Sequence, residues 1–136
     1  MANSENKSPM KMFTAGFNCA QIVASYCAEK NGEDVLTARA AMGGFGGGMN
    51  CGEVCGAVSG GIYSLGRYCN HCDYEDFDSS EKVILMTNEF TGSFKQEFGN
   101  LRCAQLAPDH DMSNCHLYIK KASELANEII ERDRNK

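Results

Sequence analysis

Cysteine is the residue type with which this chain could do chemistry. Eight cysteines occur in 136 residues: Cys19, Cys27, Cys51, Cys55, Cys69, Cys72, Cys103 and Cys115. A thiolate is both a nucleophile and a soft metal ligand, so clustered cysteines indicate either disulfide exchange or a metal or iron–sulfur centre. No Ser-His-Asp order or paired-carboxylate motif stands out. We therefore expect thiol chemistry, of a kind that composition alone leaves open.

Several cysteines are expected at the starts of helices. Cys51 and Cys55 are four residues apart on the first turns of a predicted helix, and Cys115 follows Ser113, which we expect to cap the last helix. The positive end of a helix lowers the pKa of a thiol, which favours reactive or ligating thiolates. Cys27 instead lies on an apolar stripe, so we expect it to be a small buried hydrophobic residue.

The remaining candidates are less specific. Cys69 and Cys72 form a C-x-x-C pair, and Asp73 after it excludes covalent c-type haem attachment, which needs a histidine there. The pair could be half of a metal site, a dithiol or an incidental surface pair. The three histidines are scattered, and His116 is more simply a polar residue at a helix end. We expect Glu53, between Cys51 and Cys55, to cap a helix.

Helices are the elements expected to position these residues. Apolar residues recur at steps of three and four along most of the chain, and no β-alternation of any length occurs. The five expected helices run from the Ser8-Pro9 cap to Asn31, from Asp34 to Met42, from the Asn50 cap through Leu65, from Asp78 or Ser79 to Gly99, and from the Ser113 cap through Leu117, Leu125 and Ile129. The fourth helix has an apolar face formed by Val83, Met86, Phe90 and Phe94. The sequence thus predicts an all-α, single-domain bundle over residues 1–136.

A glycine-rich run over residues 43–48 precedes the third helix. It matches neither the Walker nor the dinucleotide-binding pattern, so we do not expect nucleotide binding. Gly52, Gly56 and Gly60 follow at four-residue spacing, and each costs about 1 kcal/mol relative to alanine in a helix interior. Either tight helix packing requires them, or they line a groove that brings cysteines from several helices together.

These motifs resemble the C_GCAxxG_C_C family of small proteins described as redox-active. The resemblance is carried by Gly16-Phe17-Asn18-Cys19-Ala20-Gln21, the glycine run, the segment from Cys51 to Gly61, and Cys103 and Cys115. It implies that the family's named cysteines are Cys19, Cys55, Cys103 and Cys115, and that they converge. The family also resembles part of split-Soret cytochromes, whose haem-attachment motif is missing here. Cys69 and Cys72 lie outside the family pattern.

The leading hypothesis is a redox-active protein, an oxidoreductase or an electron-transfer protein. Cys19, Cys55, Cys103 and Cys115 would cycle between dithiol and disulfide or, together with Cys51, hold a Cys-ligated metal or an iron–sulfur cluster. The alternatives are a non-catalytic helical module with a structural metal, and a small-molecule-binding bundle whose cysteines only pack.

Charge and hydropathy limit the partners and the compartment. The net charge of −5 and the pI of about 5.1 oppose binding to nucleic acid or to an anionic membrane. The polar N-terminus lacks the apolar run of a secretion signal, and the apolar stretches are too short for a membrane span. We therefore expect a cytoplasmic protein with reduced thiols. The redox partner is unknown, and a homo-oligomer is left open.

Overall fold

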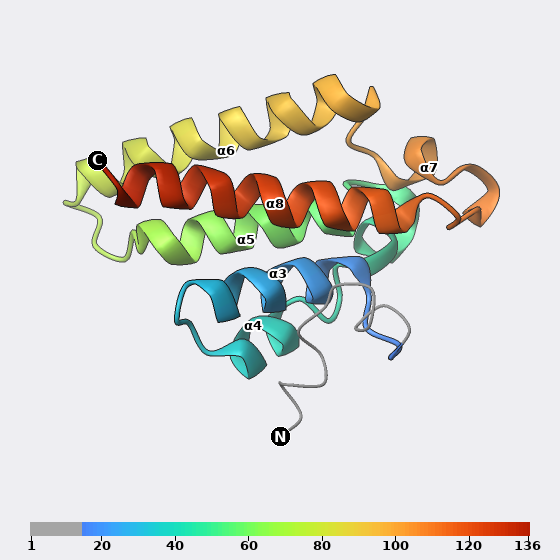
Figure 1. Cartoon of the computed structure of the whole chain (residues 1–136), viewed down its shortest axis with the longest axis horizontal. Helices are drawn as coiled ribbons and strands as arrows, with labels where there is room; N and C mark the ends of the chain where they lie inside the picture. The colour runs from blue at the N-terminus through green and yellow to red at the C-terminus, as the bar shows by residue number, and fades with distance from the viewer. Residues whose placement is uncertain (1–14) are drawn as a thin grey trace.

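Five helices of seven or more residues dominate the computed structural model, which describes residues 15–136 (Figure 1). They are α3 (Cys19–Lys30), α4 (Val35–Ala41), α5 (Gly56–Cys69), α6 (Phe77–Phe98) and α8 (Cys115–Arg134). Three short elements lie between them: the turn η1 (Gly48–Gly52), the four-residue α7 (Cys103–Leu106) and the turn η2 (Pro108–His110). The prediction of an all-α bundle of about five helices, with a glycine-rich loop before the third, is confirmed.

Helix α5 lies at the centre of the bundle. It packs against α3, α6 and α8, and α4 packs against α3. Figure 1 shows that α3, α5 and α8 all begin at the right-hand end of the molecule, whereas α6 runs back from the other end. The N-termini of three long helices therefore lie together, and α7 lies at the same end.

The core forms where these helices meet. Met86, Phe90 and Phe94 of α6 are buried, as are Leu125 and Ile129 of α8, so most of the predicted apolar stripes are confirmed. Leu117 is an exception, because it is 45% exposed. The buried face of α8 runs through Tyr118, Ile119, Ala122, Leu125, Ala126, Ile129 and Ile130, and Leu117 lies just outside it.

Two of the glycines in α5 allow close helix packing. A Cβ on Gly61 would overlap the ring of Phe90, which is fully buried. A Cβ on Gly60 would lie 2.7 Å from the carbonyl oxygen of Ala20 and 3.0 Å from the Cβ of Val23. Tight helix packing therefore explains both residues. Gly52 lies outside the helix and has a φ of +77°.

The structure changes two of the predicted helices. The start at Ser8 and Pro9 lies outside the described residues, but the predicted helix is not continuous to Asn31, because residues 15–18 are not helical and α3 begins at Cys19, after Gly16 with a φ of +97°. Helix α5 begins at Gly56 rather than after Asn50. The chain before it is left-handed, because four consecutive residues from 47 to 50 have φ values near +60°.

The N-caps of the later helices lie one to three residues from their predicted positions. The N-cap of α6 is Asp76, whose side chain accepts a hydrogen bond from the Ser79 N–H, rather than Asp78 or Ser79. The N-cap position of α8 is Asn114 rather than Ser113. The predicted end of α6 at Gly99 is confirmed, and this glycine has a φ of +85°, a left-handed conformation that favours glycine.

Candidate functional site

A cavity of about 570 Å³ lies at the end of the bundle where α3, α5 and α8 begin. Five cysteines line it: Cys19, Cys51, Cys55, Cys103 and Cys115. The structure therefore brings together every cysteine to which the sequence assigns a site role. All eight cysteines lie within the described residues and are free thiols.

Four of these thiols share a place in the secondary structure. Cys19, Cys103 and Cys115 are the first residues of α3, α7 and α8, and Cys55 is the N-cap residue of α5. Helix N-termini carry partial positive charge, which stabilises thiolates. The sequence predicts such a place for Cys55 and Cys115 but misses it for Cys19 and Cys103. The signal for Cys19 was present, since Asn18 and Gln21 have the spacing of a capping box.

Cys51 is positioned differently from the prediction. It does not share a helix with Cys55, because it lies in η1 after the left-handed residues Met49 and Asn50. Its exposed thiol donates a hydrogen bond to the Gly48 carbonyl oxygen at 3.5 Å. A left-handed conformation costs a non-glycine residue about 1–2 kcal/mol, so surrounding contacts must hold this turn at the cavity.

A short backbone bridge positions Cys55 and Cys103. The Cys55 N–H donates to the Leu101 carbonyl and the Cys103 N–H donates to the Glu53 carbonyl, each at 2.7 Å. These bonds flank an isolated antiparallel bridge between Val54 and Arg102. Because side chains alternate along extended backbone, Cys55 and Cys103 project to the same side of the bridge. No local sequence signal indicates this pairing, since α5 and α6 separate the two segments.

Glu53 does not have the capping role expected from the sequence. It precedes α5 by three residues, and its side chain forms an ion pair with Arg102 at 3.5 Å. Both side chains are about half exposed, and such surface pairs contribute about 0–1 kcal/mol. The backbone of Glu53, rather than its carboxylate, therefore positions Cys103.

The thiols of Cys19 and Cys115 line the same cavity and shift each other's pKa. Interaction with the Cys19 side chain lowers the pKa of Cys115 to about 7, although burial opposes the shift. The same interaction, reinforced by burial, raises the pKa of Cys19 far above its usual range. Cys115 also begins the 20-residue helix α8, whose dipole favours the charge on this sulfur. Cys115 is therefore the first thiol of the pair to lose its proton.

The other buried thiols of the cavity are held neutral. Burial raises the pKa of Cys55 to about 11, despite hydrogen bonding from the backbone of Ala57 and Val58. Burial also raises the pKa of Cys103, which is half-buried. Among these recessed cavity thiols, Cys115 is the one whose pKa is lowered.

Asn18 ties the start of α3 to the glycine-rich loop. Its Oδ1 accepts a hydrogen bond from the Gln21 N–H at 2.8 Å, and its Nδ2 donates to the Gly43 carbonyl at 3.1 Å. A Cβ on Gly46 would overlap the Asn18 side chain. Cys19 follows directly, so Asn18 links one cavity thiol to the loop that leads to Cys51. The sequence motif contains Asn18, but its spacing did not reveal this positioning role.

Gly56 brings α5 against the cavity thiols. A Cβ there would lie 3.0 Å from the Ala20 nitrogen, 3.1 Å from the Phe45 carbonyl oxygen and 3.2 Å from the Cys19 Cβ. Two of these contacts are backbone atoms, which cannot move as easily as the end of a flexible side chain. Gly56 thus allows Cys55 and Cys19 to approach each other from two helices.

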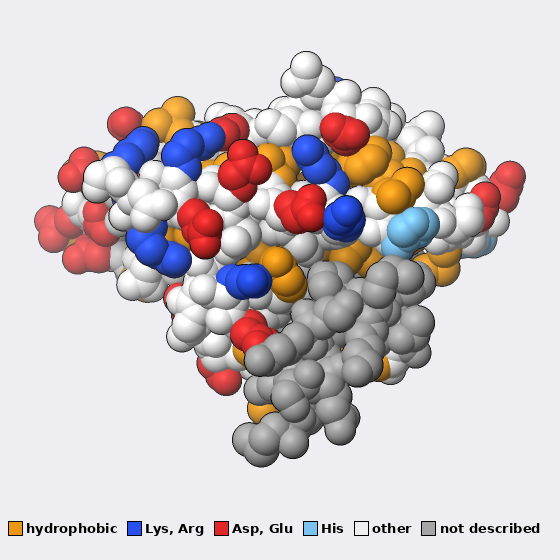
Figure 2. Space-filling model, viewed as in Figure 1, with side chains coloured by type: hydrophobic (Ala, Val, Ile, Leu, Met, Phe, Trp, Pro, Cys, Tyr) orange, Lys and Arg blue, Asp and Glu red, His pale blue; other side chains and the backbone are white. Residues whose placement is uncertain are grey.

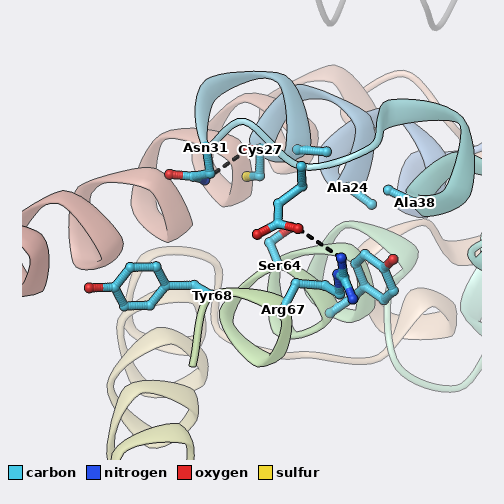
Figure 3. Close-up of a pocket in the computed structure, with 10 residues that line it drawn as sticks. Ala24, Cys27, Asn31, Ala38, Ser64, Arg67 and Tyr68 are labelled. Carbon is cyan, nitrogen blue, oxygen red and sulfur yellow. Dashed lines mark hydrogen bonds and ion pairs between the residues drawn. The ribbon is translucent and has the colours of Figure 1, made fainter. Parts of the chain in front are cut away.

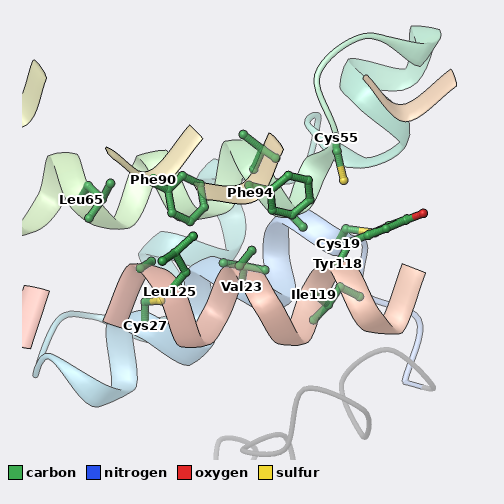
Figure 4. Packing of buried hydrophobic residues seen from close by; sticks show 14 of the residues in the cluster. Cys19, Val23, Cys27, Cys55, Leu65, Phe90, Phe94, Tyr118, Ile119 and Leu125 are labelled. Carbon is green, nitrogen blue, oxygen red and sulfur yellow. The ribbon is translucent and has the colours of Figure 1, made fainter. Parts of the chain in front are cut away.

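Cys27 lies apart from the cavity. Figure 4 shows Cys19, Cys55 and Tyr118 at one end of the core and Cys27 towards the other. Cys27 is 1% exposed, and burial raises its pKa to about 11. A second cavity beside it, shown in Figure 3, measures only about 10 Å³, which is room for no more than about one water molecule. The prediction that Cys27 is a core residue is confirmed.

Cys69 and Cys72 also lie outside the cavity. Cys69 is the last residue of α5, and its Sγ contacts the Met86 Sδ at 3.4 Å. Cys72 is exposed, and its thiol donates to the Asn70 Oδ1 at 3.3 Å. Each thiol of the C-x-x-C pair therefore has its own separate partner.

The cavity thiols do not form a ready-made metal site. Within residues 15–136, no three His, Cys, Asp or Glu side chains are grouped so that they could hold a metal ion. A four-thiolate zinc site needs sulfurs about 2.3 Å from the ion, so the cavity thiols would have to move closer together. His110 lines the cavity, and His116 is exposed and does not.

Comparison with known proteins agrees with the thiol arrangement. Residues 17–129 match the model of a family described as "Putative redox-active protein (C_GCAxxG_C_C)". The chain belongs to this family. No match was found among curated proteins or among solved structures. The C_GCAxxG_C_C cysteines recognised in the sequence, Cys19, Cys55, Cys103 and Cys115, are the four cavity thiols at helix starts.

Among the described helices, none is long and apolar enough to cross a membrane.

Proposed function

We propose that this C_GCAxxG_C_C protein is a single-domain cytoplasmic thiol–disulfide oxidoreductase in which Cys19 and Cys115 cycle between dithiol and disulfide. The observation that carries the proposal is that both cysteines line one cavity, and the opposite shifts of their pKa values support it. The pair joins α3 to α8, so the disulfide would link segments far apart in the chain. A reducing cytoplasm would supply the dithiol state from which the cycle starts.

Cys115 is the attacking thiol. Because its pKa is about 7, Cys115 is a thiolate in about half of the protein molecules at neutral pH. The thiolate attacks one sulfur of a substrate disulfide R–S–S–R′, and the S–S bond breaks. The thiolate R′S⁻ leaves and takes a proton from solvent, while Cys115 forms a mixed disulfide with the remaining half of the substrate.

Cys19 is the resolving thiol. It gives its proton to solvent and attacks the Cys115 sulfur, so RS⁻ leaves and is protonated. The two sulfurs end about 2.05 Å apart in the new disulfide. The balance is two electrons, because one substrate disulfide becomes two thiols while Cys19 and Cys115 are oxidised. A cellular dithiol reverses the exchange and resets the pair.

Cys55 and Cys103 form the second dithiol of the proposed site. The bridge between Val54 and Arg102 supports this role because it holds both cysteines on the same side, at the cavity. One of them can attack the Cys19–Cys115 disulfide and the other can complete the transfer. This internal exchange moves the disulfide to the second pair without net oxidation or reduction.

A Cys-ligated metal or iron–sulfur centre for electron transfer is the second candidate. Five thiols around a cavity of about 570 Å³ favour it, since a dithiol alone needs neither the number nor the space. Soft thiolates are the ligands that such centres use. Metal analysis and an absorption spectrum of protein purified without oxygen test this candidate. A stoichiometric metal content that Cys115→Ser abolishes would favour it over the dithiol.

The dithiol proposal is tested by mapping the first disulfide formed. Reduced protein is treated with a limiting amount of bis(2-hydroxyethyl) disulfide, the remaining thiols are alkylated, and the peptides are analysed by mass spectrometry. We expect a Cys19–Cys115 link, and we expect Cys19→Ser to accumulate a mixed disulfide on Cys115. Cys27→Ser, altered in the core, is the matched control and should still form the link. A first link between other cysteines, or none at all, would refute the proposal.

A further inference from the structure

The thiols proposed to react are recessed in the cavity. Cys19 and Cys115 expose 8% and 6% of their surface, whereas Cys51 in the same cavity is exposed. A sulfur attacked by Cys115 must come within bonding distance of this recessed atom. The substrate must therefore enter a space of about 570 Å³, which lies in the usual range for small-molecule sites, about 300–1,000 Å³. A disulfide held in the surface of a folded protein brings too much surrounding chain to enter.

The walls of the cavity are largely apolar. Leu106, Met112 and Tyr118 line it together with small residues such as Ala104 and Ala107. The Tyr118 hydroxyl already donates to the Leu106 carbonyl at 2.8 Å, so Tyr118 offers a ligand mainly its ring. Such walls favour an apolar ligand body with few polar groups.

Charged side chains are few in the part of the cavity wall that the structure describes. Among the described residues that line it, none is lysine or arginine, and the only carboxylate belongs to Asp109. His110, which follows Asp109 directly, also lines the cavity. The helix N-termini carry positive potential, and the thiolate of Cys115 offsets part of it. A substrate with carboxylates would therefore meet the carboxylate of Asp109 and, among the described lining residues, no lysine or arginine side chain.

From these three observations we propose that the substrate of this cavity is a small, uncharged disulfide with an apolar body. This inference rests on the proposed dithiol function. It separates the preferred substrate from two other disulfide classes, anionic disulfides such as glutathione disulfide and disulfides of folded proteins.

Three probe disulfides test the selectivity: neutral bis(2-hydroxyethyl) disulfide, anionic glutathione disulfide and insulin. The rate of Cys19–Cys115 disulfide formation is measured with each and divided by the rate of the same probe with free N-acetylcysteinamide, which corrects for intrinsic reactivity. We expect the corrected rate for the neutral probe to exceed that for glutathione disulfide at least tenfold and that for insulin at least a hundredfold. Equal corrected rates would overturn the inference. Failure of all three probes to form the link would instead overturn the dithiol function itself.

A charge placed in the cavity wall provides a second test. Met112 lines the cavity and is 54% exposed, so substitution there leaves the core intact. Met112→Lys should raise the ratio of the corrected rate with glutathione disulfide to that with the neutral probe several-fold. Met112→Gln, of similar size and uncharged, is the matched control: it also makes the wall more polar, but it should leave this ratio unchanged. A ratio that is the same in Met112→Lys and in the parent protein would contradict the role given to wall charge.

Discussion

Helix α5 carries a cysteine at each end, and the two thiols have different surroundings. Cys55 precedes the first turn and lines the cavity with four other cysteines, whereas Cys69 is the last residue and packs against Met86. Their exposed fractions are similar, 5% and 9%. Burial alone therefore does not distinguish a site cysteine from a packing cysteine. The N-terminal end of a helix favours thiolates and the C-terminal end opposes them, and other thiols gather only at the N-terminal end of α5.

The end of the bundle near Cys69 is charged. Figure 2 shows acidic side chains gathered at the left of the molecule, where the α5–α6 connection and the end of α8 lie. Asp133 accepts hydrogen bonds from Tyr68 at 2.6 Å and from Lys82 at 3.0 Å, and both lower its pKa. Burial raises the pKa of Cys69, and of the nearby charges Lys82 lowers it and Asp133 raises it. Unlike Cys115, Cys69 therefore has surroundings that keep its thiol neutral.

The largest expected difference between the cavity and the core is in thiol reactivity. At pH 7 the thiolate fraction of Cys115, with a pKa of about 7, exceeds that of Cys27, with a pKa of about 11, by about a thousandfold or more. The lower intrinsic nucleophilicity of Cys115 offsets only part of this, so its alkylation by iodoacetamide should be at least about a hundredfold faster. The rate should rise with pH and level off above about pH 8, as measured by mass spectrometry.

Variants of Cys19 separate its effect on the pKa of Cys115 from the disulfide. Cys19→Ala removes the interacting thiol, so the pKa of Cys115 should rise and the midpoint of its pH profile should move upward. Cys19→Ser keeps a hydroxyl donor, so the midpoint should stay near pH 7 although no disulfide can form. An unchanged midpoint in Cys19→Ala would show that the Cys19 side chain does not set the reactivity of Cys115.

The glycines of α5 should differ in the sign of their effect on stability. Gly61→Ala and Gly60→Ala place a methyl group against Phe90 and Ala20, and such overpacking costs about 1–3 kcal/mol. Gly56→Ala should also destabilise, and it should in addition slow formation of the Cys19–Cys115 disulfide. Gly66→Ala is the control, because nothing lies within 4 Å of its Cβ, and it should stabilise by up to about 1 kcal/mol.

Urea denaturation of the four glycine variants measures these differences. A Gly56→Ala protein that is more stable than the parent and has unchanged disulfide formation would mean that α5 does not crowd the cavity. Destabilisation of Gly56→Ala with unchanged disulfide formation would assign this glycine to helix packing alone, like Gly60 and Gly61.

Substitution of Asn18 should have a smaller effect. It should change both the free energy of unfolding and the position of the glycine-rich loop. Asn18→Ala removes the cap of α3 and should cost about 1 kcal/mol in the free energy of unfolding. Asn18→Ser keeps a capping oxygen but cannot reach the Gly43 carbonyl. Asn18→Ser should therefore be less destabilising and still increase the alkylation rate of Cys51, because the loop is released. A Cys51 rate equal to that of the parent would show that Asn18 acts only as a cap.

The smallest expected effect concerns Cys27. Its side chain is almost fully buried, so Cys27→Ala should cost about 1 kcal/mol, as for the loss of one methyl-sized group in a core. The formation of the Cys19–Cys115 disulfide should not change. Exposed Cys72→Ala is the control and should leave the unfolding free energy unchanged. Slower disulfide formation in Cys27→Ala would show that the core cysteine is coupled to the cavity.

Much of the helical architecture could be predicted from the sequence, because helical periodicity is a local property. The stripe through Met86, Phe90 and Phe94 predicted the buried face of α6, and Gly99 predicted its end. The place of Cys27 in the core also followed from its stripe. The set of cavity cysteines came from their motifs, since these contain Cys19, Cys51, Cys55, Cys103 and Cys115.

The start of α5 and the pairing of the thiols were decided only by the tertiary structure. Met49 adopts a left-handed conformation that its residue type does not favour, and contacts elsewhere must compensate for the strain. The bridge between Val54 and Arg102, and the cavity that Cys19 and Cys115 share, each join segments far apart in the chain. The spacing of apolar residues in the sequence indicates which face of each helix is buried. The distances between separate segments depend instead on how the helices pack together.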